Sequence, residues 1–222
     1  DKPKQYEYRP PITDKIFECQ KQLQDSYPKI SGLIGEICHL IIQGKSFEES
    51  LDELINGNLS KNFSNDEFSL FKEFLQQLFL KISQKNKSGN NYSTFFRKMQ
   101  RITQEYMIVN FNYDFLAQFT LENSTTNIKF DNIDSYITNS IKLIHYHGSV
   151  LWKRNEQNTE ILINNYNTND CNPLLMSPTV RGKSFVCPDS HIEKLKEYAK
   201  EANVIIIIGW KGSEEHFNKE IL

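Results

Sequence analysis

The sequence has almost no excess of charge of either sign. Its 222 residues include 26 basic and 28 acidic side chains, which leave a formal net charge of −2. Proteins that bind nucleic acid or anionic membranes through bulk charge carry a clear basic excess. We therefore expect neither nucleic acid nor a membrane as a partner. Hydrophobic residues make up 38% of the chain and charged residues 24%, the ordinary composition of a soluble globular protein.

Cysteine pairs with the spacing of a zinc site are missing. The cysteines are Cys19, Cys38, Cys171 and Cys187, and none of them lie within the short spacing of a zinc knuckle or ribbon. Scattered cysteines in a chain of this size are typical of reduced intracellular thiols. The cysteine pattern therefore predicts no metal and a reducing compartment.

Long hydrophobic runs are missing as well. The longest apolar run, VIIIIGW at 204–210, is far too short to cross a bilayer. The polar, charged start DKPKQYEYRPP has none of the features of a secretory signal. We expect a soluble, cytoplasmic protein. Its length predicts one domain over 1–222, which can bury a core without metals or disulfides.

The first hundred residues carry the patterns of helices. Residues 29–43 have apolar side chains at helical spacing. The sequences SFEE at 46–49 and SNDE at 64–67 are capping boxes, which begin helices. The second of these helices carries a stripe of apolar and aromatic side chains over 68–82. We expect a mainly helical subdomain or insertion over 28–104.

In the second half of the chain, strand patterns alternate with helix patterns. YMIVN at 106–110 and SIKLIHYHG at 140–148 are short apolar runs rich in strand-forming residues, and a helix is expected over 190–202. NVIIIIGWKG at 203–212 is the clearest strand, because consecutive β-branched residues indicate burial on both faces of a parallel sheet. This alternation predicts an α/β core over 105–222, built as a Rossmann-like doubly wound parallel sheet.

Three of the predicted strands end in unusual residues. The first ends in NFNYD at 110–114, the second in HYHGS at 145–149 and the third in GWKGSEEHF at 209–217. Ligands of open parallel sheets bind at the carboxyl ends of the strands. The sequence therefore predicts that Asn112 and His147 meet at one edge of the sheet, in a binding or catalytic site.

Each of these residues also has a structural interpretation. Asn112 is a favoured residue at the start of a helix, and Asp114 can interact with the positive end of a helix. His147, taken alone, is more often structural than catalytic. His145 should point to the opposite side of its strand, where we expect it to pack or to form hydrogen bonds.

Together, these stretches resemble the sirtuin family, and more closely its divergent bacterial branch of sirtuin-like NAD-hydrolysing domains. Strands of that branch end in a Thr-Thr-Asn-Tyr-Asp type motif, in His-Gly-Ser, and in Ile-Gly-Tyr-Ser or similar. The segment RPPITDKIF at 9–17 is similar to the one that follows the family's first glycine-rich loop. The residues that match the three motifs are Asn112, Tyr113, Asp114, His147, Gly148, Ser149 and, more loosely, Gly209 and Trp210.

The chain departs from the family pattern at several positions. Asn110 and Phe111 stand where small hydroxyl residues are frequent, and Lys211 stands where a serine is frequent. The zinc-binding cysteine pairs of deacylating sirtuins are missing, which argues against a protein deacylase. The opening strand and its Gly-x-Gly-type loop are missing too. We therefore expect a domain that is incomplete at both ends and belongs to a longer protein.

The resemblance implies cleavage of the nicotinamide–ribose bond of NAD, as an effector of bacterial anti-phage defence. NAD would be the substrate, no metal would be needed, and the expected partners are a sensor domain and further copies in a homo-oligomer. His147 would be the general base or would orient a ribose hydroxyl, and Asn112 would position the attacking water or the ribose. Asp114 would recognise the carboxamide. The cleft would also be shaped by Tyr113, Gly148, Ser149, Gly209 and Trp210.

Two other functions stay open at this point. The same fold could bind NAD or ADP-ribose without cleaving it. Alternatively, the helical first half could serve as an oligomerisation module, although its aromatic stripe over 68–79 is more typical of a core than of an interface.

Overall fold

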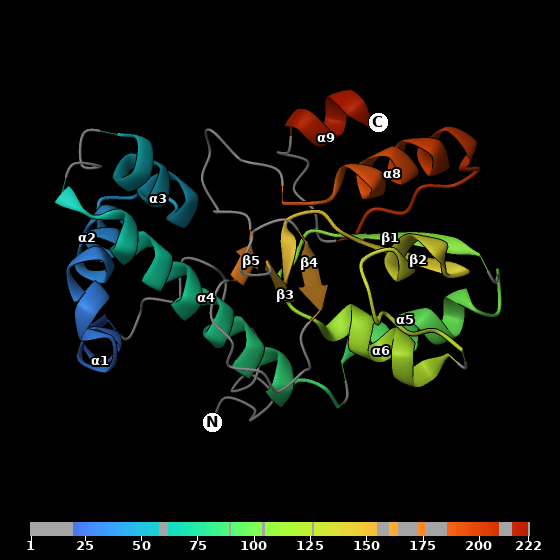
Figure 1. The fold of residues 1–222 in the computed structure, drawn as a ribbon, viewed down its shortest axis with the longest axis horizontal. Coiled ribbons are helices and arrows are strands. Elements are labelled where there is room, and N and C mark those ends of the chain that lie inside the picture. Colours follow the sequence, from blue (N-terminus) through green and yellow to red (C-terminus); the bar gives the residue numbers. More distant parts are fainter. Residues whose placement is uncertain are drawn as a thin grey trace.

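The structure is a computed structural model, and the mixed α/β fold that it gives is mostly helical (Figure 1). Within the part of the chain that the structure describes, one pair of strands is parallel, and a second group of three strands is antiparallel. The residues that the structure describes are 20–57, 62–88, 90–103, 105–125, 127–154, 160–163, 173–175, 186–208 and 215–221.

Helices fill the first half of the described chain. Figure 1 shows α1, α2 and α3 gathered at one end of the molecule, with the long helix α4 leading from them toward the strands. Their bounds are α1 Gln20–Ser26, a 3-10 helix Pro28–Ile30, α2 Ser31–Ile42, α3 Phe47–Asn56, α4 Asn65–Lys85 and α5 Asn91–Met99.

The predicted capping boxes begin α3 and α4. The Ser46 hydroxyl accepts a hydrogen bond from the Glu49 backbone N–H at 3.2 Å, and the Glu49 carboxylate accepts one from the Ser46 N–H at 2.8 Å. Ser64 and Glu67 repeat the arrangement at 3.2 and 2.9 Å. These bonds satisfy backbone donors that a helix start leaves open. Gly44, with a φ of 93°, ends α2 in a left-handed conformation.

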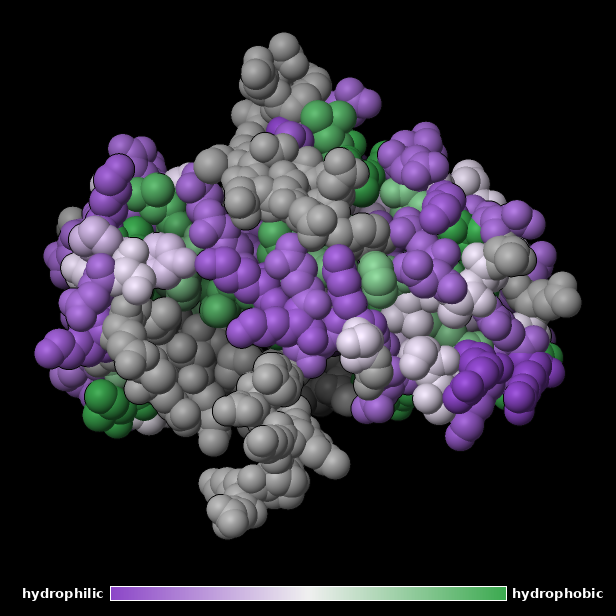
Figure 2. All heavy atoms as spheres, turned by 90° about the horizontal axis from the view of Figure 1, so that it is seen from below, coloured by the Kyte–Doolittle hydropathy of each residue, from purple (hydrophilic) through white to green (hydrophobic). Residues whose placement is uncertain are grey.

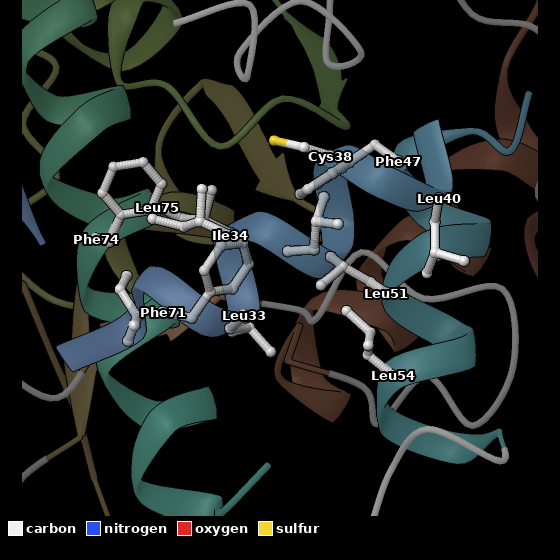
Figure 3. Close-up of a cluster of buried hydrophobic side chains, with 12 residues drawn as sticks. Leu33, Ile34, Cys38, Leu40, Phe47, Leu51, Leu54, Phe71, Phe74 and Leu75 are labelled. Atoms are coloured by element: carbon white, nitrogen blue, oxygen red, sulfur yellow. The ribbon is translucent and has the colours of Figure 1, made fainter. Parts of the chain in front are cut away.

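The helical end of the molecule has an apolar core of its own. Figure 3 shows side chains from α2, α3 and α4 pointing toward one another. Phe71, Phe74 and Leu75 of α4 are only 2–4% exposed, so the stripe of α4 is core, as its sequence indicates. Figure 2 shows the whole molecule from below, and the described residues on this side of it are mainly hydrophilic. The residues buried in this core are Ile30, Leu33, Ile34, Ile37, Cys38, Leu40, Phe47, Leu51, Leu54, Phe71, Phe74 and Leu75.

The second half of the described chain contains the strands and four further helices. The predicted strands at 106–110 and near 141–145 are confirmed as a parallel pair, and the predicted helix near 190–202 is present as α8. The elements are β1 Tyr106–Asn110, α6 Leu116–Ser124, α7 Ser135–Thr138, β2 Ile141–His145, β3 Gly148–Arg154, β4 Ile161–Ile163, β5 Pro173–Leu175, α8 Asp189–Glu201 and α9 Glu215–Glu220. β1 pairs with β2, and β3 pairs antiparallel with both β4 and β5.

Helices cover both faces of the parallel pair. On one face, Ile108 and Leu143 pack with Phe96 of α5 and Leu121 of α6. On the other, Met107 and Val109 pack with side chains of α8 and α9. Two helical layers around a parallel sheet are the arrangement that such sheets require, because both of their faces are apolar.

The predicted strand at 140–148 is divided in two. β2 ends at His145, residues 146 and 147 form a turn, and Gly148 begins β3. Gly148 has a φ of 85°, a conformation that residues with a Cβ rarely adopt. The glycine that we read as the end of one strand is therefore the point where a turn leads into the next strand.

The clearest predicted strand is not a strand in the structure. Residues 204–208 have no regular secondary structure, and their side chains are 54–74% exposed. The prediction of a buried central strand is therefore wrong for the described chain. A β-branched run forms a strand only where a neighbouring strand supplies hydrogen bonds and packing, and no strand of the described ranges pairs with it.

Some sequence predictions fall outside the residues that the structure describes. They concern the segment 9–17, Cys19, Cys171, and both Gly209 and Trp210. Among the helices of the described ranges, none combines the length and the apolar character that a membrane span needs.

Candidate functional site

The carboxyl ends of β1 and β2 lie side by side. Asn110, the last residue of β1, is the register partner of His145, the last residue of β2. Immediately beyond, the Tyr146 N–H donates a hydrogen bond of 3.0 Å to the Asn110 carbonyl. The Val150 N–H then donates to the Tyr113 carbonyl at 2.9 Å. The stretches 110–114 and 145–149 therefore meet at one edge, as the sequence predicts.

Aromatic contacts join the two stretches around His147. The Phe111 ring lies edge-on to the imidazole, with ring centroids 5.4 Å apart, and the Tyr113 ring lies 6.2 Å away. Tyr113 also packs against Phe79 of α4 at 5.5 Å. His147 is half-buried, so these rings limit the directions in which its side chain can turn while leaving part of it accessible.

Side-chain to backbone hydrogen bonds shape the 110–116 turn. The Asn110 side-chain carbonyl accepts from the Asn112 N–H at 3.0 Å, and Asp114 Oδ1 accepts from the Leu116 N–H at 2.9 Å. Asparagine and aspartate favour such turns because their short side chains reach the backbone two residues ahead. Asp114 thus binds the start of α6, in agreement with its structural interpretation.

Asn112 does not cap a helix. α6 begins only at Leu116, with Phe115 as the residue before it, so the structural interpretation of Asn112 as a helix cap is wrong. The Asn110 side chain stabilises a turn at this point, and α6 begins only after it. Asn112 is exposed, and its side chain hydrogen-bonds the hydroxyl of Tyr92 in α5.

Tyr92 is a residue that sequence reasoning did not find. Burial and the charge of Asp114 raise the pKa of Tyr92 to about 12, against the hydrogen bond from Asn112. Burial also raises the pKa of Asp114, and the Leu116 N–H opposes that change. The Tyr92 hydroxyl therefore stays protonated at neutral pH. It interacts with the side-chain amide of Asn112 and with the carboxyl group of Asp114. Its only sequence signal is its helical spacing from Phe96, which indicates a core residue.

Gly148 and Ser149 form the first residues of β3, below the turn. Both are buried, and the Ser149 hydroxyl oxygen accepts a hydrogen bond of 3.2 Å from the Leu151 N–H. The Ser149 side chain is fully enclosed. Its hydroxyl is therefore directed into the protein, where it supports the start of the strand.

His145 is a packing residue, as predicted. Its side chain is 0% exposed and lies edge-on to Trp152 and Tyr136, with ring centroids 5.6 and 6.0 Å apart. Burial lowers the pKa of His145 to about 3. The Asn112 backbone lies near enough to oppose this shift, but neither ring nitrogen has a partner at hydrogen-bond geometry. His145 is therefore neutral at physiological pH.

A chain of buried hydrogen bonds lies beneath His145. The Trp152 Nε1–H donates to the Tyr136 hydroxyl at 3.2 Å, and that hydroxyl donates to Gln118 Oε1 at 2.5 Å. His191 of α8 bonds the Ile133 carbonyl through Nε2 at 2.9 Å. The first two bonds tie β3, α7 and α6 together, and the third ties α8 to the segment before α7.

Within the described ranges, histidine, cysteine and acidic side chains nowhere come together as a metal-binding group of three or more. No protein-family model matches the sequence, and no curated protein matches it at a significant level.

Proposed function

We propose that this protein hydrolyses NAD at the nicotinamide–ribose bond, giving nicotinamide and ADP-ribose. The observation that carries the proposal is the meeting of two short motifs, NYD at 112–114 and HGS at 147–149, at the ends of neighbouring parallel strands. The proposal includes the finer fold, a Rossmann-like doubly wound sheet. The parallel pair with helices on both faces supports it, because that is the repeating unit of such sheets.

The chemistry requires a base, a positioned water and a pocket for the nicotinamide. Glycosidic bonds to ribose break through an oxocarbenium-like state. Nicotinamide leaves with the bonding electron pair, water adds to the anomeric carbon, and His147 accepts the proton of that water. Asn112 positions the water or the ribose. Its exposure and its bond to Tyr92 support this role, since the amide is accessible and held in one orientation.

The remaining residues have supporting roles in the proposal. Asp114 recognises the carboxamide, because its carboxyl oxygens can accept hydrogen bonds from an amide NH₂ group. Tyr113 packs against His147 and limits its rotation. The Gly148 turn gives the cofactor room, and Ser149 holds that turn through Leu151. We assign Gly209 and Trp210 to the same cleft from their sequence alone.

In the cell, such an activity would deplete NAD. We include in the proposal that the protein acts in the cytoplasm as an effector of bacterial anti-phage defence, controlled by a sensor domain and working as a homo-oligomer. These parts rest on the resemblance of the motifs described above.

The test is incubation of the purified protein with NAD, followed by chromatography for free nicotinamide. We expect release by the natural sequence and none by His147→Ala or Asn112→Ala. Matched controls are His39→Ala and Asn123→Ala, which change exposed residues that have no role in the proposed site and should keep full activity. Binding of NAD by calorimetry without nicotinamide release would favour a silent binding module and would exclude the proposed hydrolysis.

A further inference from the structure

Asn110 forms hydrogen bonds to both of the motifs that meet at the edge of the sheet. Its side-chain oxygen Oδ1 accepts a bond from the Asn112 N–H at 3.0 Å. Its backbone carbonyl accepts a bond from the Tyr146 N–H, also at 3.0 Å, and Tyr146 directly precedes His147. A single residue therefore joins the backbone of Asn112 to the backbone next to His147.

The two bonds of Asn110 depend on different parts of the residue. The bond from Tyr146 goes to the main chain at the end of the β1–β2 pairing, so any residue at position 110 can accept it. The bond from Asn112 goes to the side chain. Only a short side chain with an acceptor oxygen reaches the N–H two residues ahead. The bond that fixes Asn112 therefore requires asparagine or a residue with a similar acceptor.

Phe111, between these two asparagines, is held by its ring. The ring centroid lies 5.4 Å from that of His147, 5.3 Å from that of Tyr146 and 5.2 Å from that of Phe217 in α9. These contacts anchor the middle of the turn against the stretch that carries His147. The Asn110 side chain anchors the next residue, Asn112.

Asparagine is an unfavourable residue for stability at the end of this strand. Asn110 is only 6% exposed, and its Nδ2 has no hydrogen-bond partner among the residues that the structure describes. A buried donor without a partner is costly, and asparagine is depleted in strands. Valine would fill the position without an unpaired donor. A residue that breaks such local rules is expected where function requires it.

We propose that Asn110 is a positioning residue of the candidate site, which fixes the place of Asn112 relative to His147. Asn110 acts through the Asn112 backbone and does not contact the substrate. This role rests on the proposed hydrolysis, because Asn112 and His147 are the groups that position the water and accept its proton. A displacement of about 1 Å at a reacting group can reduce a rate by about 100-fold. Loss of the Asn110 oxygen should therefore slow the reaction in a protein that stays folded.

A matched pair of variants separates this role from a purely structural one. Asn110→Val and Asn110→Thr have nearly the same shape, but only threonine has an oxygen that can accept the Asn112 N–H. For Asn110→Val we expect a kcat of nicotinamide release that is lower by about 10- to 100-fold. Its KM should change little, because the groups that bind the substrate remain, and its Tm should equal or exceed that of the natural protein. Asn110→Thr should retain most of the kcat.

The other outcomes of this comparison overturn the proposed role. Equal kcat values for the natural protein and Asn110→Val would do so and would leave the proposed hydrolysis in place. Equal losses of kcat in both variants would also do so, since the acceptor oxygen would then not matter. A kcat of Asn110→Val that falls only together with its Tm would assign the side chain to the fold alone. If the natural protein releases no nicotinamide, the proposed hydrolysis fails, and this role fails with it.

Hydrogen exchange of the Asn112 amide tests the contact without using NAD. In the whole protein, Asn110→Val should speed the exchange of this amide by about 10-fold or more, because its acceptor is removed. Asn110→Thr should leave it nearly unchanged. The Val150 amide, which donates to the Tyr113 carbonyl at 2.9 Å, is the internal control and should exchange equally in all three proteins. An Asn112 amide that exchanges at the same rate in the natural protein and in Asn110→Val would overturn the proposed role.

Discussion

Buried polar groups differ in their hydrogen bonding between the helical end of the molecule and the region of the parallel strands. At the helical end, Ser50 is fully buried, and its hydroxyl donates a hydrogen bond of 2.7 Å to the Ser46 carbonyl one turn earlier. Around the parallel strands, buried nitrogens of Asn110, His145 and His191 have no hydrogen-bond partner within the described chain. Unsatisfied buried polar groups are costly and are tolerated mainly where function needs them.

α4 joins these two regions. Its first half contributes Phe71 and Phe74 to the helical core, and its second half places Leu80 against Phe115, Val150 and Leu151. Gln76, in the middle, donates a buried hydrogen bond of 2.8 Å to the Val150 carbonyl in β3. α4 therefore connects the helical end to β3, the strand that follows His147, while the residues of the proposed chemistry lie in the strand region.

If the strand region carries the proposed activity, a substitution there should change activity without changing stability. His147→Ala should reduce NAD hydrolysis by at least about 100-fold, the usual contribution of a general base, and should leave the Tm nearly unchanged because the side chain is half-buried. Nicotinamide release and thermal unfolding measure the two effects. A folded His147→Ala protein with normal activity would remove the reason for assigning function to the strand region.

In the helical core, a substitution is expected to lower the stability of the fold. Phe71→Ala removes a ring that is 3% exposed and should lower the free energy of unfolding by about 3–5 kcal/mol, the cost of a large cavity. Denaturant unfolding measures this loss. Ile42→Ala, at an exposed position of the neighbouring helix, should cost far less. A similar cost for both substitutions would show that the helical end is loosely packed.

The buried His145 predicts a loss of stability in acid. Its pKa is about 3 in the folded protein and 6.5 in a free side chain, so the unfolded chain binds more protons between these values. The contribution of His145 to the free energy of unfolding is then fully present above about pH 6.5. It falls by up to several kcal/mol as the pH drops toward 3. His145→Phe should weaken this dependence in denaturant unfolding at a series of pH values. An identical dependence in both proteins would contradict a neutral, buried His145.

The smallest effect is expected at a helix start. Ser64→Ala removes the hydroxyl that accepts the Glu67 N–H and should lower the free energy of unfolding by about 1 kcal/mol. Ser69→Ala, an exposed serine inside the same helix, should be neutral or slightly stabilising because alanine favours helix interiors. If the two variants behave alike, the capping box contributes nothing measurable.

Local features of the fold were predictable from sequence. The two capping boxes, the apolar stripe of α4 and the strands β1 and β2 depend on residues close together in the chain, and all are present. The contact between 110–114 and 145–149 was predictable because parallel strands end at a common edge.

Features that depend on distant partners were not predictable. The apolar pattern of 204–208 indicates a strand, but a strand also needs a neighbour, and the described residues do not provide one. The turn before Gly148 was not predictable because it depends on the positive φ angle of this glycine. Tyr92 reaches Asn112 only through the packing of α5 against the sheet, so no spacing in the sequence reveals it.

The proposed hydrolysis is tested most directly by one measurement, the amount of free nicotinamide after incubation of the purified full-length protein with NAD. We predict release of nicotinamide and ADP-ribose in equal amounts, with none from Asn112→Ala and full release from Asn123→Ala. Intact NAD after prolonged incubation of the full-length protein would contradict the proposed hydrolysis.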